Sequence, residues 1–334
     1  MSAEPAIVAA ADVSAADLLE LTTLSLGESP HRTREFWRWK HEASPFGASP
    51  GLAAVAGGRP VGVRMLLRWR WVAGASGYAA VRAVDTATHP EFRRRGLFRR
   101  LTLTLLEKLE AEGVDFVFNT PNPQSRAGYL KMGWVRLGRL PVRVRPRLGG
   151  GSGGDAPPGP GGSGALKPVR ELLSLPGLPA FLEGVSAGEQ RRLSTPRDVD
   201  YLRWRYEAVP GYVYGASWRL EASRGAVLIA REGLRRGRRE LLVSELLVSD
   251  EAFGRASATA LLRSVLGSSR ARYALVSTPP ATAAAAAAAR AGFLPPLPLG
   301  PDVVYRPLAI RDRRPDLGRG VAAWGFSLGD LEVF

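Results

Sequence analysis

A stretch rich in glycine, proline and serine, LGGGSGGDAPPGPGGSGAL from Leu148 to Leu166, divides the chain into two halves of similar size. A segment of this composition has no apolar periodicity and cannot bury a core. The 334 residues are also enough for two domains of roughly 150 residues each. We therefore predict a first domain at residues 1–147, a linker at 148–165 and a second domain at 166–334.

The two halves carry a weak internal repeat. REFWRWKHEASPFG at 34–47 is similar to VDYLRWRYEAVPGYVYG at 199–215, and both are typical of an amphipathic helix that ends in a Pro/Gly turn. DFVFNTPN at 115–122 parallels RYALVSTPP at 272–280, each a short β-rich run stopped by Thr-Pro. Two copies of one mixed α/β unit explain this pattern, and chance similarity between two ordinary α/β segments is the alternative.

The composition narrows the chemistry. The chain has no cysteine and three histidines (His31, His41 and His89), which excludes thiol nucleophiles, disulfides and Cys/His zinc sites, and we expect no metal. The net charge of +15 favours polyanionic partners such as nucleotide phosphates, nucleic acid or an acidic carrier protein. Four of the 46 basic residues are lysines, so the excess also reflects an arginine-rich composition and local clusters are more informative.

The sequence predicts a cytoplasmic protein without a membrane partner. Its apolar runs are shorter than the roughly 18 to 20 residues that cross a bilayer. The N-terminal MSAEPAI has neither a basic leader nor a signal-length apolar run, and the C-terminus carries no lipidation or retention motif.

One segment, 79–109, combines a strand, a basic turn and a helix. Val81–Thr88 is β-branched and partly alternating, so it predicts a strand, which Pro90 stops. Leucines recur every four residues from Leu97, which predicts a helix that Gly113 closes. The turn between them, RRRGLF, leads into the helix N-terminus, where free N–H groups and the helix dipole bind phosphate. A solvated basic helix start is the alternative.

Together with the later segment NPQSRAGYLKMGW at 122–134, this turn resembles motifs of the GCN5-related N-acetyltransferase (GNAT) family. The family motif of a basic residue, two variable positions, Gly, one variable position and a small residue is similar to Arg93-x-x-Gly96-x-Phe98, with Phe98 where the family has Gly or Ala. The later family pattern is matched in full at its five positions: Asn122, Ser125, Tyr129, Gly133 and Trp134.

The resemblance implies two tandem acetyltransferase-fold halves in the α/β class, each a mixed, mostly antiparallel sheet flanked by helices. The second half resembles a degenerate copy, because Phe253 and Ala256 stand in place of Arg93 and Gly96, and Ala288 in place of Tyr129. The implied activity is transfer of an acyl group from acetyl-CoA or another acyl-CoA to a primary amine of a small molecule or peptide. The implied donor-binding residues are Thr86, Ala87, Thr88, Arg93, Arg94, Arg95, Gly96, Leu97, Phe98, Arg99, Asn122 and Ser125.

The resemblance also implies roles in catalysis. Backbone N–H groups at 86–88 would hold the oxyanion, because strands that separate after Thr88 expose main chain. Tyr129 would protonate the departing thiolate, since a phenol with a pKa of about 10 stays protonated at neutral pH. Asp85, on the face opposite Thr86, is the nearest acidic residue and a candidate base, with a structural, paired carboxylate as the alternative. Glu28, Glu35 and a water chain are further options for the base.

Four further residues are candidates for the acceptor side. Glu28 and Trp37 fall in the helical region that walls the acceptor pocket in the family. Some tandem members place a terminal carboxylate in the active site, and Phe334 or Asp330 would supply it here, while a C-terminal strand at a sheet edge is the alternative.

Other functions remain open on the same fold. An acyl carrier protein is an alternative donor, because its acidic surface suits the positive field. A non-catalytic acyl-CoA sensor would need no acid at Tyr129. Tandem halves and a basic surface also occur in aminoacyl-tRNA-dependent transferases, but the intact coenzyme A motifs argue against a nucleic-acid partner.

Overall fold

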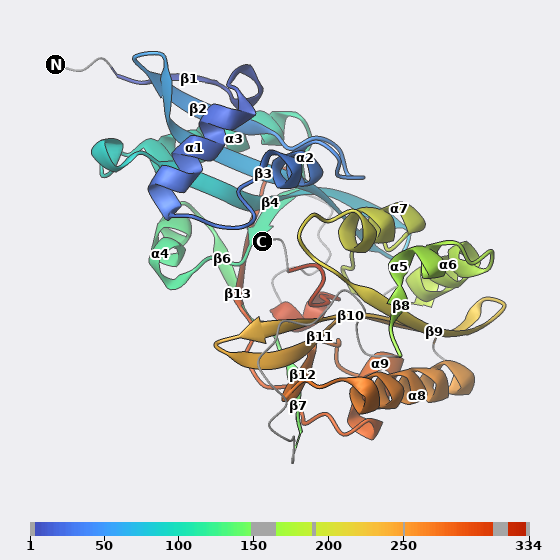
Figure 1. Cartoon of the computed structure of the whole chain (residues 1–334). Helices are drawn as coiled ribbons and strands as arrows, with labels where there is room; N and C mark the ends of the chain where they lie inside the picture. Colours follow the sequence, from blue (N-terminus) through green and yellow to red (C-terminus); the bar gives the residue numbers. More distant parts are fainter. Residues whose placement is uncertain (1–3, 148–164, 189–191, 250, 310–319, 332–334) are drawn as a thin grey trace.

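The computed structural model describes residues 4–147, 165–188, 192–249, 251–309 and 320–331. These residues form two mixed β-sheets, each flanked by helices (Figure 1), which confirms the predicted fold class. Within these ranges, no helix has the length and apolar character that a membrane crossing requires. Most of the predicted linker, 148–164, lies outside the described residues.

The first sheet has seven strands, and its one parallel pair is β4 with β5. Their spatial order is β1 (Ala6–Ala9), β2 (Gly51–Ala56), β3 (Arg59–Ala73), β4 (Ser76–Thr88), β5 (Phe116–Asn119), β13 (Asp302–Pro307) and β6 (Val135–Arg139). The predicted strand at 81–88 is thus the second half of β4.

Helices cover both faces of the first sheet: α1 (Ala15–Leu26) and α2 (Arg34–His41) on one, α3 (Leu97–Ala111) and α4 (Pro123–Lys131) on the other. The 3-10 turns η1 (Ala10–Asp12) and η2 (Pro90–Phe92) precede α1 and α3. The leucine stripe of α3 is buried from Leu97 to Leu109, as its four-residue spacing predicts. Alternation along β3 explains the two cores, since Val63 and Met65 face α1 whereas Leu66 faces α3.

The second sheet has six strands, in the order β7 (Arg143–Pro146), β12 (Tyr273–Val276), β11 (Arg238–Val248), β10 (Arg224–Arg235), β9 (Gly215–Glu221) and β8 (Lys167–Pro168). Its one parallel pair is β11 with β12. Its helices are α5 (Val169–Leu173), α6 (Leu178–Gly188), α7 (Val199–Leu202) with the π-helical turn η3 (Arg203–Glu207), α8 (Ala252–Ser268) and α9 (Ala283–Arg290). A further 3-10 turn, η4 (Val321–Ala323), precedes the C-terminal segment.

Each half of the chain contributes a strand to the sheet of the other half. β7 belongs to the first half of the sequence but pairs with β12, with Val144 opposite Leu275. β13 belongs to the second half but lies between β5 and β6, with Val304 opposite Asn119. Figure 1 shows β13 rising from the lower sheet into the upper one. The predicted boundary at 147 therefore separates segments of sequence whose sheets interlock.

The two repeats meet at equivalent tryptophans. Trp39 of α2 and Trp204 of η3 occupy the same place in the repeated sequence. The Trp39 indole N–H donates to the Trp204 carbonyl at 2.7 Å, and the Trp204 indole N–H donates to the Trp39 carbonyl at 2.9 Å. Their rings stack with centroids 5.1 Å apart. Each of the two tryptophans therefore makes the same contact with the other.

Candidate functional site

The candidate site begins where β4 and β5 separate. The two strands pair only at Ala80–Phe116, Val81–Val117 and Arg82–Phe118. β4 then continues to Thr88, while the chain leaves β5 after Asn119, because Pro121 lacks the N–H that would extend the pairing. The separation begins after Arg82, earlier than the sequence predicts, and leaves one edge of β4 without a neighbouring strand. We call this edge of β4, from Ala83 to Thr88, the β4 notch.

Two predicted donor-binding residues present main chain to the β4 notch. The His89 N–H donates to the Val61 carbonyl at 2.9 Å, so His89 faces β3. Because main-chain groups alternate in an antiparallel ladder, Ala87 also faces β3, whereas Thr86 and Thr88 face the notch. Ala87, which lies between these two residues and was predicted with them, therefore directs its amide to β3 and its buried side chain toward α1.

The basic turn next to the notch has the geometry of an anion site. Gly96 is the cap residue of α3 with φ 75°, and no side chain among the described residues caps this helix start. The Arg100 N–H makes the first helical bond, to the Gly96 carbonyl at 3.0 Å, so the N–H groups of 97–99 precede it. Arg94 also has a positive φ, of 63°. Arg94 and Gly96 are separated by Arg95, so two left-handed residues within one turn direct backbone N–H groups toward the start of the helix.

The arginines of the turn are exposed, as the phosphate hypothesis requires. The Arg93 guanidinium donates to the Ser25 carbonyl at 2.9 Å, and its Nε lies 3.4 Å from the Thr88 carbonyl. Arg95 lies over the ring of Phe92, with 4.8 Å between guanidinium and centroid. Arg99 is exposed on the first turn of α3.

A buried arginine that the sequence reasoning missed lies beside Tyr129. Arg64 of β3 is opposite Thr86 in the hairpin and is 1% exposed. Its Nη1 donates to the Tyr129 hydroxyl at 2.9 Å and to Thr86 Oγ1, so it bridges from β4 to α4. Its Nε and Nη2 have no hydrogen-bond partner among the described residues. A buried guanidinium without a counter-charge is costly, and an anionic ligand at this place would offset the cost.

The sequence signal for Arg64 is weak because arginines alternate with apolar residues along RPVGVRMLLRWRW, as solvent-facing residues do. Its place opposite Thr86 in the β3–β4 hairpin is the signal that identifies it. The ring of Phe98 packs edge-on against Tyr129 at 5.6 Å, and the Arg64 guanidinium lies over both rings. The Phe98 substitution in the family motif therefore forms part of the Tyr129 environment.

Asn122 and Ser125 form the N-terminal cap of α4. The Asn122 side-chain oxygen accepts from the Ser125 N–H at 2.8 Å and from the Ser125 hydroxyl at 3.0 Å. In this structure they fix the start of the helix that carries Tyr129. Direct contact of either residue with a donor stays a prediction.

Asp85 forms the β-bulge of β4 and faces the opposite side of the sheet from Thr86. Its carboxylate lies 2.8 Å from Lys40 Nζ and 2.9 Å from His41 Nε2, both on α2. Burial raises the pKa of Asp85, but the Lys40 charge and the His41 hydrogen bond outweigh it and hold the pKa well below its usual range. Burial lowers the pKa of His41. A carboxylate so stabilised is a weak base, so the geometry favours the paired role for Asp85.

The predicted acceptor residues Glu28 and Trp37 lie on the same side of the first sheet as Asp85. Glu28 is exposed in the loop between α1 and α2. Trp37 is 8% exposed and packs its ring against His41, with centroids 4.3 Å apart, so it contributes to the core beneath α1 and α2.

The C-terminal segment approaches the β4 notch. Arg82, where the pairing of β4 with β5 ends, donates to the carbonyls of Asp330 and Leu331, the latter at 2.9 Å. The Asp330 carboxylate is buried and pairs with Arg197 at 2.8 Å. Phe334, predicted to carry a catalytic carboxylate, lies outside the described residues.

Comparison with known families finds a match in the first half. A family model described as an acetyltransferase (GNAT) domain matches residues 9–136, which contain the β4 notch, the basic turn and Tyr129. No curated protein has a sequence that matches the chain significantly.

Solved structures share the fold over most of the chain. A GCN5-related N-acetyltransferase from Kribbella flavida is 17% identical with a TM-score of 0.60, over 91% of this chain and 72% of that one. One from Anabaena variabilis is 12% identical with a TM-score of 0.60, over 87% and 69%. A conserved protein of unknown function from Enterococcus faecalis is 13% identical with a TM-score of 0.60, over 92% and 73%. At these identities the likeness concerns the fold.

Proposed function

We propose that residues 9–136, which match the GNAT acetyltransferase family model, transfer an acyl group from an acyl-CoA, with acetyl-CoA the first candidate, to a primary amine of a small molecule or peptide. The observation that carries the proposal is the convergence of three features at the β4 notch. These are an open strand edge, an uncapped helix N-terminus and a buried Arg64–Tyr129 pair.

Each feature suits one part of the donor. The N–H groups at the start of α3 and the arginines Arg93 to Arg95 bind the diphosphate. The main-chain groups of Thr86 and Thr88 pair with an amide-containing arm laid along β4. The thioester then lies near Tyr129.

The chemistry is direct transfer. The neutral amine attacks the thioester carbonyl carbon, and the tetrahedral intermediate carries an oxyanion, which main-chain N–H groups of β4 stabilise. Collapse breaks the C–S bond and forms the amide. The Tyr129 hydroxyl protonates the departing thiolate, while the attacking nitrogen loses its proton to water. Arg64 stabilises the phenolate that Tyr129 becomes, because its Nη1 already donates to that oxygen.

We place the acceptor on the α1/α2 side, with Glu28 and Trp37 as candidate contacts and the C-terminal segment as a wall. We propose that the second half is a degenerate copy of the same unit, because β11 and β12 separate as β4 and β5 do. The proposed domains keep the boundaries 1–147 and 166–334, with the exchange of β7 and β13 between their sheets.

Calorimetric titration with acetyl-CoA, a long-chain acyl-CoA and free CoA tests the donor site. We expect the wild type to bind these ligands. We expect Gly96→Glu to lower the affinity at least about tenfold, because it puts a carboxylate where the diphosphate binds. Gly58→Glu is the matched control, because Gly58 has the same φ of 75° and equally open surroundings in the β2–β3 turn. Absence of binding by every CoA species would contradict the proposal and favour the carrier-protein donor. Equal losses in both variants would contradict the placement of the diphosphate at Gly96.

Tyr129→Phe separates an enzyme from a sensor. The variant keeps the ring that packs against Phe98, so we expect it to bind acetyl-CoA like the wild type. With a panel of amines, we expect its turnover to fall about 100-fold, the usual cost of losing a general acid. Binding without turnover of any amine by the wild type would favour the sensor.

A further inference from the structure

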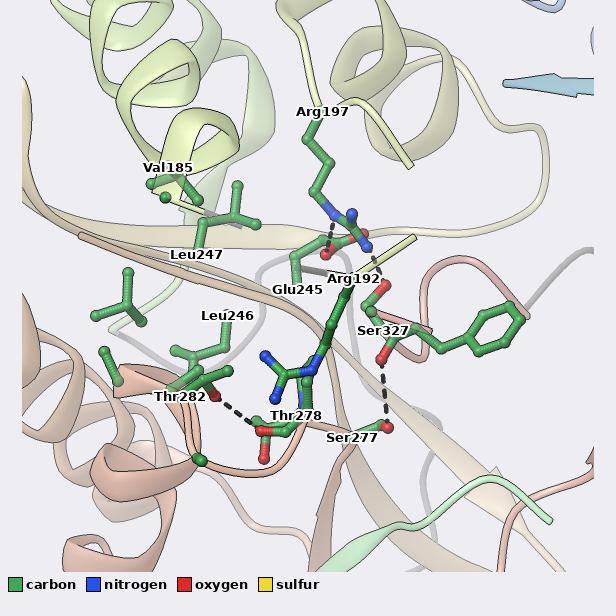
Figure 2. Close-up of a pocket in the computed structure, with 18 of the residues that line it drawn as sticks. Val185, Arg192, Arg197, Glu245, Leu246, Leu247, Ser277, Thr278, Thr282 and Ser327 are labelled. Carbon is green, nitrogen blue, oxygen red and sulfur yellow. Dashed lines mark hydrogen bonds and ion pairs between the residues drawn. The ribbon is translucent and has the colours of Figure 1, made fainter. Parts of the chain in front are cut away.

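A cavity of about 600 Å³ lies in the second half of the molecule (Figure 2). Its walls are the end of β11, the segment from Ser277 into α9, the end of α6 and the residues around η4. Its volume is within the range of small-molecule sites, roughly 300 to 1,000 Å³. None of the residues predicted from the sequence for donor or acceptor binding lines it.

The cavity follows an open strand edge. β11 pairs with β12 only from Glu240 to Val243, while the cavity contacts the four residues 245–248. Side chains alternate between the two faces of a strand, so a cavity that contacts four consecutive residues lies along its edge.

The hydrogen-bond ladder with β10 determines which residues of this edge direct main-chain groups to the cavity. The Ser249 N–H donates to the Gly225 carbonyl at 3.0 Å, so Ser249 faces β10. By alternation, Leu247 also faces β10, and Leu246 and Val248 turn their N–H and C=O groups to the cavity. Two such residues in alternate positions form the surface with which an extended amide chain pairs.

The helix start that corresponds to the proposed diphosphate site at the β4 notch is closed here. The cap residue of α8 is Glu251, whose carboxylate accepts from the Ser249 hydroxyl at 2.5 Å. Gly254 is packed so tightly that a Cβ there would overlap the Ser249 carbonyl. A carboxylate and close packing at a helix start exclude a diphosphate, so the occupant of this cavity lacks one.

The other end of the cavity is positive. Figure 2 shows the Arg192 side chain directed into the cavity, toward Leu246 and Thr278. Arg192 donates to the Pro280 carbonyl at 2.5 Å and pairs with no carboxylate among the described residues. The other arginine in the wall, Arg197, is already paired with Glu245 and Asp330.

The start of α9 adds to this positive end. The Thr282 hydroxyl caps the Ala285 N–H, and the first two residues of the helix, Ala283 and Ala284, line the cavity. The helix dipole therefore favours a negative group beside Arg192.

We propose that this cavity binds a short peptide-like carboxylate. Its extended amides pair with Leu246 and Val248, its carboxylate lies between Arg192 and the start of α9, and its apolar groups contact Val185 and Leu247. The site is independent of the donor site at the β4 notch, because other strands and helices build it.

The test uses N-acetyl-trialanine and its C-terminal carboxamide as probes in calorimetric titrations of the full chain. We expect the carboxylate to bind at least about tenfold more tightly than the carboxamide, the usual effect of one charge-assisted contact. Arg192→Gln is expected to remove that difference. Arg170→Gln, at an exposed position of α5, is the matched control and should keep it.

A second variant tests the location without touching a charge. Ala322 is exposed at the cavity wall, so Ala322→Trp should narrow the cavity, leave the fold intact and weaken both probes. Failure of both peptides to bind the wild type at millimolar concentration overturns the proposal. So does a carboxylate preference that survives in Arg192→Gln, or displacement of the peptide by saturating acetyl-CoA, which would place the peptide at the β4 notch.

Discussion

Arg64 and Tyr129 are coupled through one hydrogen bond, and their variants should show it. Under the proposed mechanism, Arg64→Met leaves the phenolate unstabilised, so we expect kcat to fall about 100-fold, as for Tyr129→Phe. The fall in kcat of the double variant should be far smaller than the product of the two single falls, because each change removes the same proton transfer. Steady-state kinetics with acetyl-CoA and one accepted amine measures this. Losses that multiply would mean that the two residues act separately.

Asp85 and His41 make stability depend on pH. The pKa of Asp85 is lower in the folded chain than in the unfolded chain, so its stabilisation is complete above about pH 5 and is lost as pH falls. Burial lowers the pKa of His41, so the unfolded chain takes up its proton first, and stability also falls as pH drops below about 6.5.

The variant Asp85→Asn tests this account. It removes the carboxylate charge that lies 2.8 Å from buried Lys40, so we expect a loss of about 2 to 4 kcal/mol in unfolding free energy at pH 7. Near pH 3.5 the difference in unfolding free energy between wild type and variant should shrink, because Asp85 begins to take up a proton in the unfolded chain there. Urea unfolding at several pH values measures it. A pH-independent difference would argue against the ion pair.

Residue-level prediction from the sequence depended on spacing. Gly96 and Tyr129 stand at fixed positions in two short motifs, which made them candidates from the sequence alone. Arg64 belongs to neither motif, and its burial results from α3 and α4 packing over β3, which the local pattern of the strand does not encode.

At the scale of elements, local sequence patterns were enough to predict an element that has a clear periodicity of its own. The leucine stripe predicted α3, and the β-branched run predicted the end of β4. The partners of short strands were not predictable in this way. β13 pairs with strands more than 150 residues away, and its six residues would suit any open sheet edge.

The C-terminal segment is an element whose removal has a defined effect. Burial, with the nearby Arg205 charge, lowers the pKa of Arg82 to about 10, so it remains charged at neutral pH and needs acceptors. Deleting 331–334 removes the Leu331 carbonyl from Arg82. We expect a loss of about 1 to 3 kcal/mol in unfolding free energy and slower turnover.

Arg82→Met provides the control for this deletion. Without the guanidinium, the deletion should cost much less stability, because no charged donor is left without its acceptor. Unchanged turnover and unchanged unfolding after the deletion would remove any role for this segment at the β4 notch.

At the scale of the whole molecule, the exchange of β7 and β13 makes each sheet depend on both halves. A fragment of residues 1–147 lacks β13, so β5 and β6 lose the strand between them. A fragment of residues 166–334 lacks β7, which covers the edge of β12. Each fragment alone therefore exposes unpaired strand edges, which are prone to aggregation.

The two fragments should consequently need one another. Expressed alone, we expect neither to unfold cooperatively, and the first not to bind acetyl-CoA. Expressed together, they should copurify as a one-to-one complex that binds acetyl-CoA, because the exchanged strands and the Trp39–Trp204 contact form between separate chains as well as within one. Joining them raises only their effective concentration, so the complex should dissociate on dilution where the intact chain does not. Full acetyl-CoA binding by residues 1–147 alone would show that the first sheet does not require β13.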